Sequence, residues 1–346
     1  MPHRCGTVAI IGRPNVGKST LLNRLLGEKI AIVSPKPETT RERLLGILTL
    51  PDAQILFLDT PGIYRGPATL LAKHQVQSAR QALTEADAIL LMTEARAGFT
   101  DDDRRILQLL PKEKTSPACP CPSSRRAAGR PVFLAINKVD RVAKSLVLPH
   151  IAESSRLYPF KEIFPISAEK GTHVEDLLKT LIESLPEGPA HYPADQITDR
   201  PMREQAQEII REKALLFTHD EIPHAVAVLV EEWRAGQPSA RKNQKTLDVQ
   251  DDPPPPASGG IPLSSQESGR RGGPSTYIRA VLHVERESQK GILIGKQGLL
   301  LKRIGQAARK ELEEQTEGPV YLDLWVKVAA NWRKDPTMLK RFGYGG

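Results

Sequence analysis

The chain has 346 residues, of which 39% are hydrophobic and 26% charged, and this length favours about two domains, each able to bury a core. No apolar run approaches the roughly 18 residues of a membrane-spanning helix, and the first residues lack the pattern of a signal or transit peptide, so a cytoplasmic protein is expected. The formal net charge of +8 favours a polyanionic partner, either nucleic acid or an anionic membrane surface.

Short apolar runs alternate with amphipathic segments up to about Leu185. The expected strands are 7–11, 43–50, 54–59, 88–92, 132–137 and 162–167, and the expected helices are 20–28, 70–86 and 173–185. Strand alternating with helix is typical of a doubly wound, mainly parallel α/β sheet. The polar segment 112–130 is expected to be a flexible surface insertion. Its cysteines, Cys119 and Cys121, have no further ligands nearby, which disfavours a metal site.

A proline-rich segment separates two expected domains. The first domain is placed at 1–186, the linker at 187–200, and the second, smaller domain at 201–346. The second domain is expected to be α+β, with a helix at 203–217 and strands at 224–233, 277–285 and 320–328. Inside it, the Pro/Gly/Ser-rich tract 235–275 lacks the apolar residues of a core and is expected to be disordered.

The stretch "GRPNVGKS" joins the first expected strand to the first expected helix, and it fits the pattern G-x-x-x-x-G-K-[ST]. In this context the pattern predicts a loop whose backbone amides surround a nucleoside phosphate. Lys18 is expected to contact the β- and γ-phosphates, and Ser19 to coordinate Mg²⁺. The positive end of the following helix acts on the same anion. The predicted nucleotide contacts of this loop are Gly12, Arg13, Pro14, Asn15, Val16, Gly17, Lys18 and Ser19.

The stretch "DTPG" ends the third expected strand, where it can reach the same phosphates. Asp59 is expected on the Mg²⁺ side, through a water, and Gly62 is expected to offer its N–H to the γ-phosphate. In "KPETTRER" one threonine is expected to bind Mg²⁺ and to sense the γ-phosphate; we prefer Thr40, although adjacent Thr39 cannot be separated from it. The predicted metal ligands are therefore Ser19, Thr40 and Asp59, and the predicted catalytic group adds Lys18 and Gly62. The further nucleotide contacts are Thr60, Pro61 and Ile63.

Ile63 follows "DTPG" at a position where many signalling GTPases carry a glutamine that orients the attacking water. Its side chain neither accepts nor donates a proton, so slow turnover is expected unless RNA, a ribosome or a monovalent cation assists. Asn15 is a candidate to hold K⁺ against the phosphates, and a simple loop residue is an equally good interpretation.

Two later stretches select the base. "NKVD" follows a buried-looking strand, and the carboxylate of Asp140 can accept from both N1–H and the exocyclic amine of guanine, whereas adenine leaves it unpaired. "SAEKG" follows the next strand and can complete the pocket. The predicted base contacts are Asn137, Lys138, Val139, Asp140, Ser167 and Ala168.

The second domain contains "GKQG" between two apolar helical turns. Glycines at both ends permit close approach to a sugar–phosphate backbone, and positive charge is concentrated around this loop and in the helix after it. A solvated basic helix face is the alternative interpretation. The predicted RNA contacts are Gly295, Lys296, Gln297, Gly298, Lys302 and Arg303.

The ordered set "GRPNVGKST", "TTR", "DTPG", "NKVD", "SAEKG" and "LHVERESQKGILIGKQG" resembles the Era family of bacterial GTPases over nearly the whole chain outside the two insertions. The resemblance implies a P-loop GTPase domain followed by a type II KH domain, with GTP or GDP and Mg²⁺ as cofactors. It further implies a monomer that binds small-subunit ribosomal RNA near its 3′ end, assists assembly of the small ribosomal subunit, and associates peripherally with the inner membrane. The insertion at 235–275, between two expected strands of the KH domain, departs from the family pattern.

Three other functions remain open at this point: a constitutive RNA-binding protein with GTP as a structural ligand, an ATP-dependent phosphotransferase, and a membrane-surface GTPase. Asp140 opposes the phosphotransferase. GTP turnover with and without ribosomal RNA separates the first from a switch.

Overall fold

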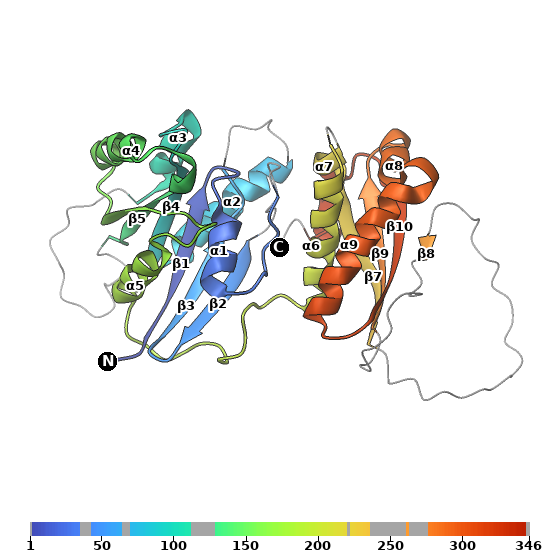
Figure 1. The fold of residues 1–346 in the computed structure, drawn as a ribbon, viewed down its shortest axis with the longest axis horizontal. Coiled ribbons are helices and arrows are strands. Elements are labelled where there is room, and N and C mark those ends of the chain that lie inside the picture. Colours follow the sequence, from blue (N-terminus) through green and yellow to red (C-terminus); the bar gives the residue numbers. More distant parts are fainter. Residues whose placement is uncertain are drawn as a thin grey trace, which may run out of the picture. The chain divides into compact units, whose positions relative to one another are not determined.

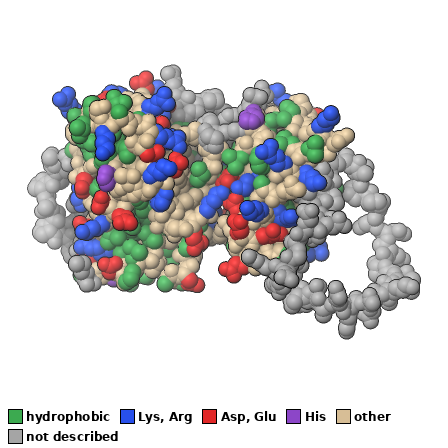
Figure 2. Space-filling model, viewed as in Figure 1, with side chains coloured by type: hydrophobic (Ala, Val, Ile, Leu, Met, Phe, Trp, Pro, Cys, Tyr) green, Lys and Arg blue, Asp and Glu red, His purple; other side chains and the backbone are tan. Residues whose placement is uncertain are grey.

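The computed structural model describes residues 2–34, 43–63, 70–111, 129–219, 222–235, 261–262 and 276–343. The chain divides into two compact units, one ending at Arg200 and the other running from Pro201 to Phe342. Figure 1 traces the elements of each unit along the chain, and Figure 2 shows basic and acidic side chains interspersed on the visible face of the described residues.

The first unit contains a six-stranded sheet in the order β2-β3-β1-β4-β5-β6. Its strands are β1 (Arg4–Gly12), β2 (Leu44–Leu50), β3 (Ala53–Asp59), β4 (Ala88–Glu94), β5 (Val132–Asn137) and β6 (Glu162–Pro165). All neighbouring strands are parallel except the β2–β3 pair. The chain places β3 on one side of β1 and β4 on the other, so the strand order reverses at β1, where open α/β sheets bind ligands.

Helices cover both faces of this sheet. They are α1 (Lys18–Leu26), α2 (Leu70–Glu85), α3 (Asp101–Leu109), α4 (Lys144–Leu157) and α5 (Val174–Ser184). One core cluster joins α1 and α5 to one face, and another joins α2, α3 and α4 to the other. Every residue of β3 and β5 is buried, which explains why these strands read as continuous apolar runs rather than alternating patterns. The fold is the doubly wound sheet that the sequence predicts.

The expected linker packs against the first unit. The side chain of Gln54 accepts from the backbone amides of His191 and Tyr192 at 2.7 and 3.0 Å and donates to the Tyr192 carbonyl at 2.8 Å. The amide of Ile47 donates to the carbonyl of Ile197 at 2.8 Å, and Gly46 pairs antiparallel with Thr198. Residues 191–192 therefore contact Gln54 of β3, and residues 197–198 pair with the outer edge of β2, the first strand of the sheet.

The second unit contains a four-stranded sheet in the order β7-β9-β10-β8, in which β9 and β10 are parallel and the other pairs antiparallel. Its strands are β7 (Ala227–Ala235), β8 (Ile261–Pro262), β9 (Thr276–Val284) and β10 (Val320–Val328). Its helices are α6 (Met202–Phe217), α7 (Ile222–Ala225), α8 (Glu287–Ile294), α9 (Leu299–Gln315) and α10 (Pro336–Arg341), with short 3₁₀ turns at Lys296–Gly298 and Trp332–Lys334. The side chains of α6, α8 and α9 fill one core with the apolar face of β7, β9 and β10.

Two local expectations differ from the structure. The strand expected from His224 begins only at Ala227, because residues 222–225 form α7 and the indole of Trp332 donates to the carbonyl of Ala225 at 3.0 Å. The strand expected to reach Ser167 ends at Pro165. Thr39, Thr40, Cys119, Cys121 and most of the two insertions lie outside the described residues; within 235–275, Ile261 and Pro262 pair with β10.

Candidate functional site

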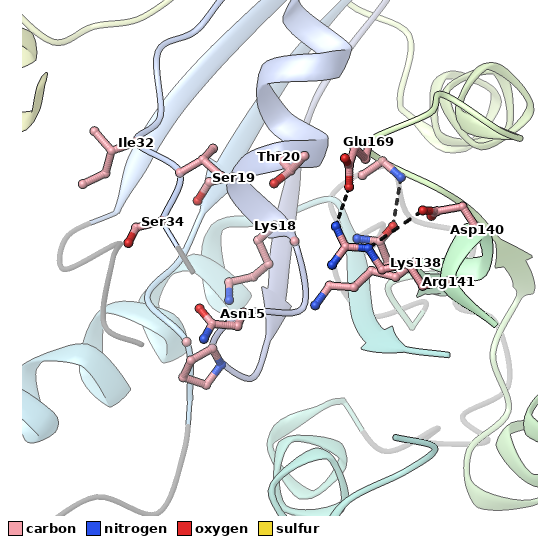
Figure 3. A pocket seen from close by; sticks show the side chains of 16 residues that line it. Asn15, Lys18, Ser19, Thr20, Ile32, Ser34, Lys138, Asp140, Arg141 and Glu169 are labelled. Carbon is pink, nitrogen blue, oxygen red and sulfur yellow. Dashed lines mark hydrogen bonds and ion pairs between the residues drawn. The ribbon is translucent and has the colours of Figure 1, made fainter. Parts of the chain in front are cut away.

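A cavity of about 600 Å³ opens at the carboxyl ends of the parallel strands of the first unit. Segments that follow β1, β3, β5 and β6 line it, together with the turn before residue 35, and Figure 3 shows the polar side chains that surround it. The lining residues are Pro14, Asn15, Gly17, Lys18, Ser19, Thr20, Ile32, Val33, Ser34, Gly62, Asn137, Lys138, Asp140, Arg141, Ala168 and Glu169. Four sequence motifs that are far apart in the chain thus meet at one site.

The loop between β1 and α1 requires glycine where the sequence places it. Gly17 has a φ of 99° and caps the start of α1, and a Cβ at this position would overlap the amide nitrogen of Asn137. A Cβ on Gly62 would lie 2.6 Å from the backbone nitrogen of Pro14. The first turn of α1 contains no acidic residue, so no carboxylate within it offsets the positive end of the helix dipole, which favours an anion.

Lys18 provides a buried cation at this end of the cavity. Its side chain is 6% exposed, and Nζ donates to the carbonyls of Gly12 at 3.2 Å and Arg13 at 3.0 Å. Burial, followed by the charge of Arg13, lowers the pKa of Lys18 to about 8 although Asp59 and Asp103 oppose the shift. A phosphate beside this ammonium restores the missing counter-charge, because an opposite charge favours the protonated form.

Ser19 and Asp59 form a donor set that suits Mg²⁺. The hydroxyl of Ser19 donates to Oδ2 of Asp59 at 2.8 Å, and the Asp59 side chain is fully buried. Oδ1 of Asp59 is buried without a hydrogen-bond donor among the described residues, and burial raises the pKa of this carboxyl. An uncompensated carboxylate oxygen beside a hydroxyl is the hard oxygen site that Mg²⁺ prefers. These residues therefore fit the ion.

The opposite end of the cavity is organised by Asn137. Its Nδ2 donates to the carbonyl of Val16 at 2.7 Å, and its Oδ1 accepts from the amide of Ala168 at 2.9 Å. Arg24 of α1 adds a second tie, because its Nε donates to the carbonyl of Ala168 at 3.1 Å. The phosphate loop and the two base-side loops are thus one hydrogen-bonded assembly, and Asp140 lies beside them in the cavity lining with its side chain 20% exposed.

An ion-pair network stabilises the phosphate loop and the loop after β5. Glu94, at the end of β4, accepts from Lys138 at 3.2 Å and lies 3.6 Å from a guanidinium nitrogen of Arg13. Arg13 is also 3.3 Å from the fully buried carboxylate of Asp103. Because Arg13 is committed to these two acids, its side chain serves the loop's conformation rather than the cavity.

The structure brings most of the predicted nucleotide contacts together, but some side chains face elsewhere. Val16 and Ile63 belong to the hydrophobic cores, and Thr60 donates its hydroxyl to the carbonyl of Ile10 at 2.9 Å. The predicted contacts that do not line the cavity are Gly12, Arg13, Val16, Asp59, Thr60, Pro61, Ile63, Val139 and Ser167. Thr40 lies outside the described residues.

Six lining residues were not among the predicted contacts: Thr20, Ile32, Val33, Ser34, Arg141 and Glu169. Thr20, Arg141 and Glu169 each stand one position beyond a predicted contact, so proximity to a motif was the available signal. Ile32 reaches the site because Asn23 holds the turn before it, accepting from the amides of Ile30 and Ala31 at 3.1 and 2.9 Å. That contact leaves no periodic signal in the sequence.

The second unit presents the "GKQG" stretch as a tight turn between α8 and α9. Gly295, Gln297 and Gly298 all have positive φ, and the exposed side chains of Lys296 and Gln297 project from the turn. Gly298 is buried and caps the start of α9, so its role in the turn is conformational.

The two basic residues after the turn differ in their surroundings. Both are exposed, but the guanidinium of Arg303 also lies 4.3 Å from the ring centre of Phe217 at the end of α6, and the neighbouring Lys302 carries an ammonium. Ile292 and Leu299 flank the turn and are 54% and 62% exposed, so the surface around it is both basic and apolar.

Comparison with known proteins gives two family matches, the 50S ribosome-binding GTPases over residues 7–138 and the KH domain over residues 269–333. GTPase Era of Geotalea uraniireducens is 43% identical over 99% of this chain and 98% of its own length. GTPase Era of Geobacter metallireducens is 42% identical over the same shares. This chain belongs to the Era family of GTPases.

Solved structures of Era share the fold across the whole chain. A crystal structure of Era with MgGDPNP and nucleotides 1506–1542 of 16S ribosomal RNA is 40% identical, with a TM-score of 0.82, and covers 99% of this chain and 100% of that one. A variant of Aquifex aeolicus Era bound to GDP·AlF₄⁻ gives a TM-score of 0.81 at the same identity and coverage. Among the described helices of this Era family member, none has the length and apolar composition needed to cross a bilayer.

Proposed function

We propose that this chain binds GTP with Mg²⁺, hydrolyses it slowly, and couples that cycle to binding of small-subunit ribosomal RNA near its 3′ end during assembly of the small subunit. One observation carries the proposal: a single cavity has Lys18 and Ser19 at one end and Asp140 at the other. Its two ends match the phosphate and the guanine edge of one nucleotide. We assign this activity to residues 1–186 and RNA binding to residues 201–346.

In this proposal Lys18 contacts the β- and γ-phosphates, and Ser19, Asp59 and Thr40 hold Mg²⁺, with Gly62 offering its N–H to the γ-phosphate. When bound, Mg²⁺ neutralises charge that develops on the phosphate oxygens. The residue directly after Gly62 is Ile63, whose side chain carries no acid–base group and packs in the core. Slow turnover follows, and Asn15, whose side chain lines the cavity, is the candidate K⁺ contact.

Substitution of Asp140 by Asn tests the base assignment. An amide presents a donor to the guanine amine, so GTP affinity should fall by orders of magnitude while affinity for xanthosine triphosphate rises. Equilibrium binding of both nucleotides gives the answer, with Asp176→Asn, on the exposed side of α5, as the matched control. Parental GTP affinity in Asp140→Asn would refute the assignment.

The RNA assignment is tested on Lys296 and Lys302, the exposed cations at the turn and in the first turn of α9. Replacement of either by Ala should weaken binding of a 16S 3′-end fragment. The plot of log affinity against log salt should also become shallower, its negative slope decreasing in magnitude by about 0.7. Lys310→Ala, at an exposed position farther along α9, is the control. Slopes equal to that of the parent in both variants would remove the turn from the RNA site.

GTP turnover distinguishes a switch from a protein that holds GTP as a structural ligand. A switch should hydrolyse GTP faster when the 16S fragment is added, whereas a structural nucleotide should remain bound and intact in both conditions.

We also propose a cytoplasmic monomer with peripheral membrane association, supported by the net charge of +8. Sedimentation with anionic vesicles, with neutral vesicles as control, tests the membrane contact.

A further inference from the structure

An ion pair spans the rim of the cavity on its base side. Arg141 ends the 3₁₀ turn that follows β5, and Glu169 lies in the loop after β6. Nη2 of Arg141 donates to Oε2 of Glu169 at 2.7 Å, and both residues line the cavity (Figure 3). Their side chains are 59% and 56% exposed, so the contact lies at the mouth of the cavity rather than on its floor.

The backbone beneath each partner is fixed by other contacts. The carbonyl of Glu169 accepts from Arg24 of α1, and the preceding residue, Ala168, is bonded to Asn137. On the other side, the amide of Arg141 donates to the carbonyl of Lys138 at 3.0 Å. Opening the rim at this point therefore requires rotation of two side chains and no movement of either loop.

Arg141 also faces the residue that we assign to the base. Its Nε lies 3.9 Å from Oδ2 of Asp140, so one guanidinium stands between the carboxylates of Asp140 and Glu169. Arg141 therefore connects Asp140, the carboxylate proposed to bind the base, to Glu169 on the loop after β6.

We propose that the Arg141–Glu169 pair is a positioning contact that closes the cavity rim over a bound guanine base and slows release of the nucleotide. The inference rests on the proposed function, because it requires a guanine nucleotide in the cavity. An exposed ion pair contributes little energy, so its loss should accelerate release by about two- to fivefold. Association, which occurs while the rim is open, should change less.

Release of a fluorescent GDP into excess unlabelled GDP, followed by stopped flow, measures the effect. Arg141→Met and Glu169→Gln should each release the nucleotide about two- to fivefold faster than the parent. The double variant should be no faster than the quicker single variant, because each change removes the same contact. Added salt should accelerate the parent by screening the pair and leave the variants nearly unchanged.

Arg156→Met, an exposed arginine on α4 away from the cavity, is the matched control and should release at the parental rate. Parental rates in both rim variants would overturn the inference, as would single effects that multiply in the double variant. Failure of the proposed function is distinguishable, since the parent itself would then not bind the fluorescent GDP.

Discussion

The hydroxyl of Ser19 lies 2.8 Å from Oδ2 of Asp59, forty residues away in the chain. The contact joins the start of α1 to the end of β3, and the other oxygen of Asp59 has no hydrogen-bond donor in the described part of the chain. Ser19→Ala removes one proposed metal ligand and also unpairs Oδ2. We expect the Mg²⁺ concentration needed for half-maximal GTP binding to rise roughly 10- to 100-fold, as measured by Mg²⁺ titration. Ser155→Ala, in α4, should leave it unchanged; an equal Mg²⁺ requirement in both variants would contradict the metal assignment.

Gly17 is predicted to be irreplaceable for two separable reasons, its φ of 99° and its contact with Asn137. Gly17→Ala should abolish nucleotide binding, because the new Cβ displaces the Asn137 amide that joins the loops. Gly98→Ala is the matched control, since Gly98 has a φ of 62° but no atom near its Cβ position. It should cost only the backbone strain, about 1 kcal/mol of unfolding free energy, and keep nucleotide affinity. Calorimetric titration with GDP and urea unfolding measure the two effects.

Because of Lys18, the nucleotide-free protein should have a larger unfolding free energy at pH 9 than at pH 7. Its pKa is lowered from 10.5 to about 8 in the folded chain, chiefly by burial. Between these values the unfolded chain keeps a proton that the folded chain has released, so stability rises with pH. Relative to Lys18→Met, the parent should gain about 1 kcal/mol of unfolding free energy from pH 7 to pH 9.

Urea unfolding of both proteins at the two pH values checks this difference. Saturating GDP should reduce it, because the phosphates favour the charged ammonium. An identical gain in parent and variant would show that other groups cause the pH dependence.

Arg303 should contribute to the fold of the second unit as well as to RNA binding. Its guanidinium lies over the Phe217 ring, a contact that joins α9 to the end of α6. Arg303→Ala should lower the unfolding free energy by about 0.5–1 kcal/mol, whereas Lys302→Ala, at an exposed neighbour, should leave it nearly unchanged. Thermal or urea unfolding resolves the two variants. Equal stabilities would mean that the cation–π contact contributes nothing to the fold.

The sequence predicts that the phosphate loop and the "DTPG" stretch meet at one edge of the sheet, because glycine spacing and strand ends are local features. Gly17 and Gly62 are required by close backbone approaches, and the strand before each motif places it at the same edge of the sheet. Nothing local indicates the Arg141–Glu169 contact, which joins two loops 28 residues apart. Such pairs depend on side-chain direction after folding, which a spacing pattern does not encode.

Some elements were missed for identifiable reasons. Helix α4 contains Pro149, which is unfavourable inside a helix, and α3 is only nine residues long with three acidic residues in its first turn. A signal for α3 did exist, since Thr100 and Asp103 form a capping box. Residues 222–225 form a helix whose last residue, Ala225, accepts a hydrogen bond from the indole of Trp332, 107 residues later in the chain. Local helix propensity cannot predict a contact between residues so far apart.

The pairing of residues 197–198 with β2 has a consequence for solubility. An outermost strand presents a row of free N–H and C=O groups to other molecules, and such rows promote edge-to-edge aggregation. Here that edge is occupied by the chain itself, through the Ile47–Ile197 and Gly46–Thr198 contacts. A fragment that stops at Pro186 would uncover β2 and should self-associate, whereas one that continues to Arg200 keeps the edge shielded. Residues 187–200 would therefore protect this sheet from edge-to-edge association with other molecules.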